Sequence, residues 1–304
     1  MLDKTTEKIN LPLPVDTHLH LSLGGDPYAN ARLQLAAGIG VVRDAGDRDA
    51  LLDEVRLPSN LTVIRTGPAI FRKGYYGNFL GDNRDLSLSE KISRTPSAFV
   101  KVILTGLVSF DEYGKVGPQQ WSLSELTEIV EMAAAVGKKV MVHVNSDKAC
   151  RKAVVAGVHS IEHGYFIGEE TLLLMAAQGV YWAPTIAAMA NQIADPDKRF
   201  SPVQLEIIKR NSQRQLEMIR FAHEAGVKLT IGTDSGSYNV PHGSTFLREM
   251  ELFVTAGITK SEVWQIATVN GCELLGIKGR PVIRLDSREP LAALLEQSRA
   301  LLKV

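Results

Sequence analysis

The stretch SLSELTEIVEMAAAVGKKVMVHV, from Ser122 to Val144, contains the unit from which the fold is built. Apolar residues recur at helical spacing in its first part: Leu126, Ile129, Val130 and Ala133. This spacing predicts a helix, with Ser124 as its N-cap and Gly137 as the glycine that ends it. The run KKVMVHV that follows is almost continuously apolar, which is typical of a strand in a parallel sheet covered on both faces.

Eight strand-like runs of this kind occur along the chain, at residues 14–21, 38–46, 61–70, 98–106, 138–144, 159–164, 179–186 and 227–236. Helical patterns lie between most of them. Eight strand–helix units predict an α/β fold of the (β/α)₈ TIM barrel type, whose usual size is about 250 residues. A doubly wound open sheet is the alternative, but it would be favoured by a Gly-x-Gly-x-x-Gly turn after the first strand, and none is present. We expect residues 1–276 to form the barrel and residues 277–304 to add a strand and a helix packed on it.

Composition restricts the partners and the compartment. The 34 basic and 34 acidic residues cancel, so nothing indicates binding to nucleic acid or to an anionic membrane surface. No run of about 18 apolar residues predicts a membrane span, and the N-terminus lacks the apolar core of a signal peptide. Cys150 and Cys272 have no metal-type spacing and fit a reducing compartment. We therefore expect a cytoplasmic protein, and the sequence leaves open whether it forms a homo-oligomer.

Ionisable residues lie within or at the ends of the predicted strands, near the face where the active site of this barrel type is found. They are His18, His20, Lys101, His143, His163 and Asp234. Neutral imidazoles and a carboxylate are ligands for zinc or a similar divalent ion. Burial beside metal ions should lower the pKa of Lys101, and its neutral amine could then take up carbon dioxide to form a carbamate that bridges two ions. A lysine paired with a carboxylate is the alternative.

The runs VDTHLH, GVVRDAG, FVKVILTG, KKVMVHVN, HSIEHG, GVYWAPTI and TIGTDSG together resemble the amidohydrolase superfamily. The resemblance is strongest to its binuclear, carboxylated-lysine branch, which includes imidazolonepropionase-like proteins and metal-dependent Xaa-Pro and Xaa-Arg/Lys dipeptidases. It implies that His18, His20 and Asp234 hold one ion and that His143 and His163 hold a second. The implied cofactors are two divalent ions, zinc above all, and carbon dioxide as carboxylated Lys101.

The same resemblance implies metal-dependent hydrolysis of a C–N bond in a small molecule: an amide, a cyclic amide or a dipeptide-like compound. A hydroxide bridging the two ions would attack the carbonyl, with Asp234 as general base and then general acid. Such proteins usually carry a small β-sandwich built from both chain ends. The ends outside the barrel are short here, so we expect the sandwich to be missing or vestigial.

Substrate-binding residues are harder to assign, because the sequence departs from the family pattern on the substrate side of the metals. Our candidates are Tyr75, Tyr76, Asn145, His242 and Arg43. Packing is the alternative for the tyrosines, and an ion pair with Asp44 is the alternative for Arg43. Residues 189–200 are long enough to act as a lid.

Two other functions stay open. A mononuclear deaminase of amino-heterocycles would use His18, His20, His143 and Asp234 around one ion and leave Lys101 unmodified. A catalytically inactive barrel would keep the ligands as a stabilising metal site. The intact Asp234 argues against the inactive barrel, because a purely structural site needs no general base.

Overall fold

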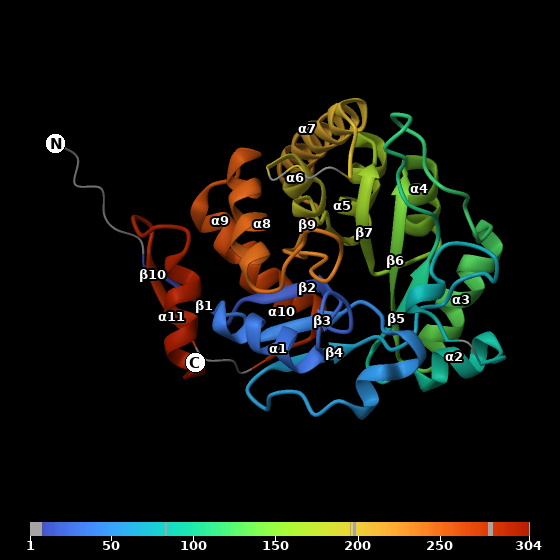
Figure 1. Ribbon diagram of the computed structural model, residues 1–304, viewed down its shortest axis with the longest axis horizontal. Coiled ribbons are helices and arrows are strands. Elements are labelled where there is room, and N and C mark those ends of the chain that lie inside the picture. The colour runs from blue at the N-terminus through green and yellow to red at the C-terminus, as the bar shows by residue number, and fades with distance from the viewer. Residues whose placement is uncertain (1–7, 83, 195, 197–198, 279–281, 304) are drawn as a thin grey trace.

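Parallel strands form the centre of the computed structural model, which describes residues 8–82, 84–194, 196, 199–278 and 282–303 (Figure 1). One sheet contains, in order, β2 (Val15–Leu19), β3 (Val41–Asp44) and β4 (Thr62–Arg65). The other contains β5 (Phe99–Ile103), β6 (Lys139–Ser146), β7 (Ser160–Phe166), β8 (Tyr181–Ala183) and β9 (Lys228–Leu229). Neighbouring strands within each sheet are parallel and follow one another in the sequence.

Backbone hydrogen bonds join the two sheets at both ends. Beyond β4, the Ile70 amide donates to the Lys101 carbonyl (2.8 Å) and the Ile103 amide donates to the Ile70 carbonyl (2.9 Å). Beyond β9, the Thr17 amide donates to the Ile231 carbonyl (2.9 Å). The strands therefore close into a (β/α)₈ barrel, and each of the eight predicted runs overlaps one of them, with β6 and β7 extending two residues beyond their runs. The predicted fold class is confirmed.

Helices surround the strands (Figure 1). They are α1 (Pro27–Ala36), α2 (Leu88–Arg94), α3 (Leu123–Ala135), α4 (Asp147–Val155), α5 (Glu169–Gln178), α6 (Ala187–Ala194), α7 (Pro202–Glu224), α8 (Ser244–Thr255), α9 (Lys260–Gln265), α10 (Gly271–Leu275) and α11 (Ala293–Leu302). Short 3₁₀ helices are η1 (Arg48–Glu54) and η2 (Asn78–Leu80), and a π-helical turn, η3 (Ile266–Asn270), links α9 to α10. None of the helices in the described part of the chain combines the length and apolar character that a membrane span requires.

The N-cap of helix α3 lies two residues earlier than predicted. Ser122, not Ser124, is the N-cap: its side chain accepts a hydrogen bond from the Glu125 amide (3.2 Å), and the Glu125 carboxylate accepts one from the Ser122 amide (2.8 Å). This reciprocal pair is a capping box, which satisfies two backbone amides at once. Ser122 therefore caps the helix more favourably than Ser124 would. Gly137, at φ +70°, follows the helix as expected.

Both ends of the chain contribute to a small sheet beside the barrel. Strand β1 (Lys8–Leu11) pairs antiparallel with β10 (Ile283–Asp286), and α11 lies next to them (Figure 1). The strand and helix expected near the C-terminus are present, whereas β1 was not predicted. In the described part of the chain, this two-stranded sheet takes the place of the β-sandwich that such proteins usually carry. The domain boundary at residue 276 stays a prediction.

Candidate active site

All six predicted metal-site residues gather in one place, within the barrel strands or after them. His18 comes from β2, Lys101 from β5 and His143 from β6, and all three are at most 5% exposed. The His163 ring lies between two of the other imidazoles, with ring centroids 4.8 Å from His18 and 4.5 Å from His143. His20 follows β2, and its ring centroid is 5.4 Å from that of His18. Residues up to 216 positions apart in the sequence, such as His18 and Asp234, are therefore neighbours in space.

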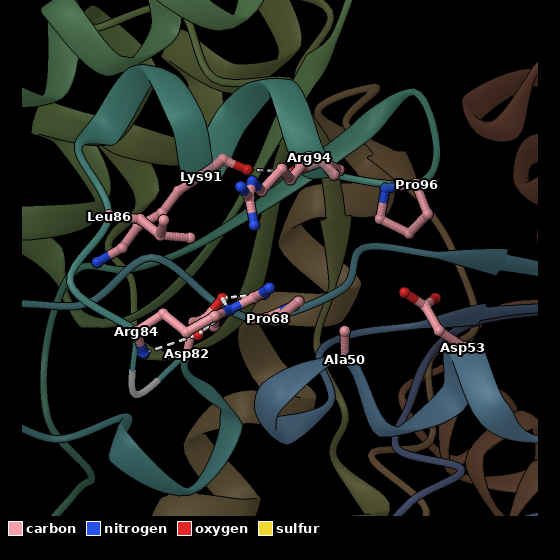
Figure 2. Close-up of a pocket in the computed structure, with 11 residues that line it drawn as sticks. Ala50, Asp53, Pro68, Asp82, Arg84, Leu86, Lys91, Arg94 and Pro96 are labelled. Carbon is pink, nitrogen blue, oxygen red and sulfur yellow. Dashed lines mark hydrogen bonds and ion pairs between the residues drawn. The ribbon is translucent and has the colours of Figure 1, made fainter.

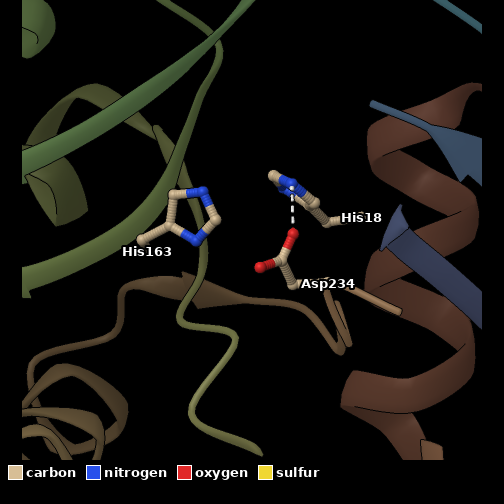
Figure 3. A group of neighbouring side chains, drawn as sticks. All are labelled: His18, His163 and Asp234. Atoms are coloured by element: carbon tan, nitrogen blue, oxygen red, sulfur yellow. Dashed lines mark ion pairs between the residues drawn. The ribbon is translucent and has the colours of Figure 1, made fainter. Parts of the chain in front are cut away.

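Asp234 faces two of these rings. Its Oδ1 atom lies 3.5 Å from His18 Nε2 and 3.4 Å from His20 Nε2. One potential ligand atom from each of His18, His163 and Asp234 lies within 4.8 Å of the other two (Figure 3). Burial alone would raise the pKa of the Asp234 carboxyl. The close approach of His20 Nε2, with further favourable interactions with His163 and His18, outweighs it and holds that pKa well below its usual range.

The hydrogen bonds of the first two histidines orient them for metal binding. His18 Nδ1 lies 2.6 Å from Glu162 Oε2, and His20 Nδ1 lies 3.1 Å from the Gly46 carbonyl. A carbonyl or carboxylate can only accept, so each Nδ1 donates and each Nε2 keeps a lone pair. His18 Nε2 is buried without a hydrogen-bond partner among the described residues. Such a set of imidazole lone pairs beside a carboxylate fits a divalent ion.

Glu162 is a site residue that the sequence reasoning missed. It is fully buried, and besides His18 its carboxylate accepts hydrogen bonds from Arg43 Nη2 (2.9 Å) and Ser160 Oγ (2.5 Å). Arg43 Nε also donates to the Thr17 carbonyl (2.6 Å). A carboxylate behind a metal-binding histidine fixes the ring and raises its basicity. The IEHG run held the signal, since a glutamate inside an apolar strand needs a buried partner.

Three site residues have left-handed backbone conformations, which are unfavourable for residues other than glycine. They are His163 (φ +68°), which lies within β7, and Thr185 (φ +53°) and Asp234 (φ +58°), which follow β8 and β9. Thr185 also supports His163, because its Oγ1 lies 2.8 Å from His163 Nδ1. Strain of this kind is concentrated at functional sites, where the surrounding structure holds it. The turn at His163 also breaks the strand alternation, so that Glu162 and His163 both reach the site.

Burial also affects the protonation of the site. It lowers the pKa values of His18 and His143, with a further contribution from the Lys101 charge, and the pKa of His143 falls to about 3. Burial likewise lowers the pKa of His163 and brings that of Lys101 to about 8. Among the described residues, no ion pair joins the Lys101 amine to a carboxylate. His18, His143 and His163 are therefore neutral at pH 7, and part of the Lys101 population is a neutral amine near pH 8.

A cavity of about 570 Å³ opens onto these groups. His20, Lys101, His143, His163 and Asp234 line one part of it. Most of the other lining side chains are apolar or aromatic, and all but Ile103 and Tyr165 of these come from the segments that follow the strands. Clefts of this size hold small molecules.

The family model described as "Amidohydrolase family" matches residues 14–280, which is most of the chain. The chain belongs to the amidohydrolase family. This membership confirms the prediction of a hydrolase that acts on carbon–nitrogen bonds. Members of this family generally depend on metal ions, and the candidate site agrees with that.

Three proteins similar to this amidohydrolase share 22% to 30% of their aligned residues with it. An uncharacterized protein of Mycobacterium tuberculosis is 30% identical over 287 residues, covering 88% of this chain and 75% of that protein. Ochratoxinase from Aspergillus niger is 28% identical over 178 residues, or 58% of this chain and 36% of that enzyme. The solved structure of a Xaa-Pro dipeptidase with bound methionine is 22% identical and has a TM-score of 0.75, with 95% of this chain and 84% of that chain covered. At 22% identity, this match shows that the two proteins share a fold and says nothing of the substrate.

Of the five predicted substrate-binding residues of the amidohydrolase, only Tyr76 lines the cavity. Its ring lies 5.3 Å from that of His143. Tyr75 is 42% exposed and lies outside the lining. Arg43 is fully buried in its ion pair with Glu162, so its charge is already paired away from the cavity. The predicted ion-pair alternative for Arg43 is therefore the observed one, with Glu162 in place of Asp44.

Two other candidates do not line the cavity. Asn145 Nδ2 donates to the Gly106 carbonyl (3.2 Å) and also lies 3.3 Å from His143 Nε2, so Asn145 contacts a metal-site residue. His242 lies between Gln34 Nε2 (3.1 Å) and the Leu23 carbonyl (3.0 Å), where it joins α1 to the segment after β9. Residues 189–194 of the predicted lid belong to helix α6, and Asp195, Asp197 and Lys198 lie outside the described residues. Met189, Gln192, Arg199 and Phe200 line the cavity, and lid motion stays a prediction.

A second cavity, of about 270 Å³, lies away from these residues beside α2 (Figure 2). Its charged lining residues are Asp53, Asp82, Arg84, Lys91 and Arg94. Arg84 is paired with Asp82, and Asp53 is paired with Arg65 (2.8 Å). It includes no histidine and none of the six metal-site residues, so the chemistry of this amidohydrolase belongs to the larger cavity.

Proposed function

We propose that this amidohydrolase is a binuclear metal-dependent enzyme that cleaves an amide, cyclic amide or dipeptide-like C–N bond. The observation that carries this proposal is the cluster of four histidines, Lys101 and Asp234, with His18 Nε2 buried and without a partner. His18, His20 and Asp234 would hold one divalent ion, most simply zinc, and His143 and His163 a second. Lys101, carboxylated by carbon dioxide, would supply the anionic ligand between them.

When bound, the ions would lower the pKa of water towards neutrality and polarise the substrate carbonyl. Asp234 accepts the proton of the water that attacks this carbonyl, since its carboxylate is ionised and faces the cavity. The same carboxylate then returns the proton to the departing nitrogen. That second transfer is needed because an unprotonated amide nitrogen is a very poor leaving group. Tyr76 lies beside His143, where its hydroxyl can orient the substrate.

A mononuclear site is the second candidate, because His18, His163 and Asp234 could hold a single ion between them. It would match a deaminase of amino-heterocycles, with Lys101 unmodified. The two candidates differ in metal content and in product.

The test combines metal analysis with turnover. We expect protein grown with zinc and bicarbonate to contain close to two ions per chain and to hydrolyse members of a panel of amides, dipeptides and cyclic amides. At most one ion per chain, together with ammonia release from heterocycles, would favour the mononuclear deaminase. Metal binding without turnover on either panel would indicate an inactive barrel.

A further inference from the structure

The cavity has two chemically different parts. Beyond the metal-site residues its wall includes five apolar or aromatic side chains that we call the apolar wall: Val108, Phe110, Tyr165, Met189 and Phe200. The charged lining residues of the described chain are Lys101 and Asp234, which belong to the metal site, and Arg199, whose guanidinium lies 4.0 Å from the centre of the Tyr238 ring. The Arg199 guanidinium also lies 5.9 Å from the centre of the Phe200 ring, so the apolar wall has a cation at its edge and no carboxylate among its described residues.

The apolar wall is supported by a hydrophobic cluster separate from the main barrel core. In this cluster Val108, Tyr165 and Met189 pack with Ile208, which is fully buried, while Phe110 and Phe200 pack against them. The Phe110 and Phe200 rings meet edge to face, with centroids 5.4 Å apart. The cluster draws on the segment after β5, on β7, on α6 and on α7.

The segment that carries Val108 and Phe110 is itself fixed as a hairpin. The Ser109 amide donates to the Lys115 carbonyl (2.8 Å), and the Gly117 amide donates to the Leu107 carbonyl (2.8 Å). A wall held by its own backbone pairing and by a hydrophobic cluster keeps its shape before the substrate arrives. Such preorganisation reduces the ordering cost of binding.

We propose that the enzyme selects amides that carry a large, uncharged, aromatic or branched apolar group on one side of the scissile bond, with that group packed on the apolar wall. This inference rests on the proposed amide hydrolysis. Burial of an aromatic ring removes a large apolar area from water, which favours such substrates. A cationic group in the same place would lose its hydration and meet the Arg199 charge in place of a carboxylate, so it would be rejected.

The test is a matched pair of substrate series for the zinc-loaded enzyme. In one series the amine is always glycinamide and the acyl group is acetyl, cyclohexanecarbonyl, 2-naphthoyl or 4-(trimethylammonio)benzoyl. In the other series the acyl group is always acetyl and the amine is methylamine, cyclohexylamine, 2-naphthylamine or 4-(trimethylammonio)aniline. In one of the two series we expect kcat/KM to rise at least 30-fold from the smallest to the naphthyl member, and to fall back for the cation. Equal kcat/KM across both series, or a preference for the charged member, would overturn the proposal.

Variants of the hairpin locate the effect. Phe110→Ala should lower kcat/KM at least tenfold for the naphthyl substrate, mainly through KM, and change that for the smallest substrate less than twofold. Glu112→Ala is the matched control, because Glu112 is on the same hairpin but is exposed and outside the lining. A Phe110→Ala enzyme that keeps the naphthyl preference would also contradict the role of the apolar wall.

A binding measurement separates this inference from the proposed function. The metal-free protein should bind 2-acetonaphthone, an uncharged compound without an amide, and Phe110→Ala should bind it at least tenfold more weakly than Glu112→Ala does. Binding of this ketone without turnover on any amide would remove the proposed function and keep the apolar selectivity. Turnover of amides with no binding of the ketone and no size preference would do the opposite.

Discussion

Glu162 links His18 to Arg43, so that residues from β2, β3 and β7 act together behind one potential metal ligand. All three side chains are buried. The carboxylate holds the His18 ring with its proton on Nδ1 and its lone pair on Nε2. The metal affinity of the proposed site would therefore depend on a residue that does not line the cavity.

Glu162→Gln should lower zinc affinity by about 10- to 100-fold, as loss of such a partner typically does. A glutamine amide can present a donor to His18 Nδ1, which favours the tautomer with the proton on Nε2. Zinc affinity is measured by competition with a chromophoric chelator, and the tautomer by ¹⁵N chemical shifts of the ring. Glu131→Gln, on the exposed side of α3, is the control. An unchanged tautomer with unchanged affinity would show that Glu162 has no positioning role.

Lys101→Ala should lose metal ions and activity together, because the bridging anion disappears. Short carboxylic acids added to this variant should partly restore both by filling the vacated space with a replacement anion. Lys101→Arg should not restore them, since the guanidinium stays charged and cannot take up carbon dioxide. Metal content and turnover are measured on the same preparations. If Lys101→Ala keeps two ions and full turnover, the carbamate bridge is wrong.

At the scale of elements, helix α6 is fixed to α8 by one buried carboxyl. Glu249 on α8 accepts hydrogen bonds from the amides of Ile186 (3.0 Å) and Ala187 (2.7 Å), at the start of α6. Burial raises the pKa of Glu249 to about 8, despite these bonds. The folded protein thus binds a proton here at pH values where the unfolded chain, with a pKa near 4.5, has released it.

This shift predicts how the stability changes with pH. Between pH 4.5 and 8 the folded state binds more protons at Glu249 than the unfolded state does, so the free energy of unfolding should fall as pH rises, by about 1.4 kcal/mol per pH unit. Asp16 and Asp44 also have pKa values raised to about 7 by burial, so the comparison is between wild type and Glu249→Gln. In urea unfolding of the metal-free proteins, the free energy of unfolding should fall less steeply with pH in Glu249→Gln than in the wild type. Identical slopes would contradict the assignment.

The barrel elements could be predicted because each strand is an apolar run closed by turn residues, as KKVMVHV is. The six metal-site residues followed from one rule, that parallel strands in this fold end at a common face. Strand β1 could not be predicted, since its four residues form a strand only against β10. Glu162 was missed because strand alternation places it opposite His163, and only the left-handed turn at His163 changes that. Arg43, Asn145 and His242 had the right chemistry, but their partners are set by tertiary packing.

At the scale of the whole molecule, the C-terminal segment is part of the packed structure. Ile283 and Leu285 of β10 and Leu294 and Leu295 of α11 are at most 7% exposed. Gly38, at φ +89°, approaches α11 so closely that a Cβ atom would lie 2.3 Å from the Leu295 carbonyl oxygen. The predicted boundary at residue 276 would therefore not separate two parts that are stable independently of each other.

A chain truncated after residue 276 should consequently fail to fold stably. Burial of four large apolar side chains is worth about 1.5–3 kcal/mol each, which together is comparable to a typical total stability of about 5–15 kcal/mol. Soluble yield and circular dichroism of residues 1–276, compared with the full chain, provide the measurement. A truncated protein with native circular dichroism and cooperative melting would show that residues 277–304 are an accessory.

The left-handed residues at positions 163, 185 and 234 place folding and catalysis under opposing selection. Glycine would relieve about 1–3 kcal/mol of backbone strain at each position, while removing two proposed ligands and the support of one of them. In a mutant library sorted only for resistance to proteolysis, we expect glycine to become enriched at these positions. In the same library sorted for turnover, glycine should be depleted at 163 and 234. The contrast between the two sorts would measure how much stability this enzyme forgoes in order to be active.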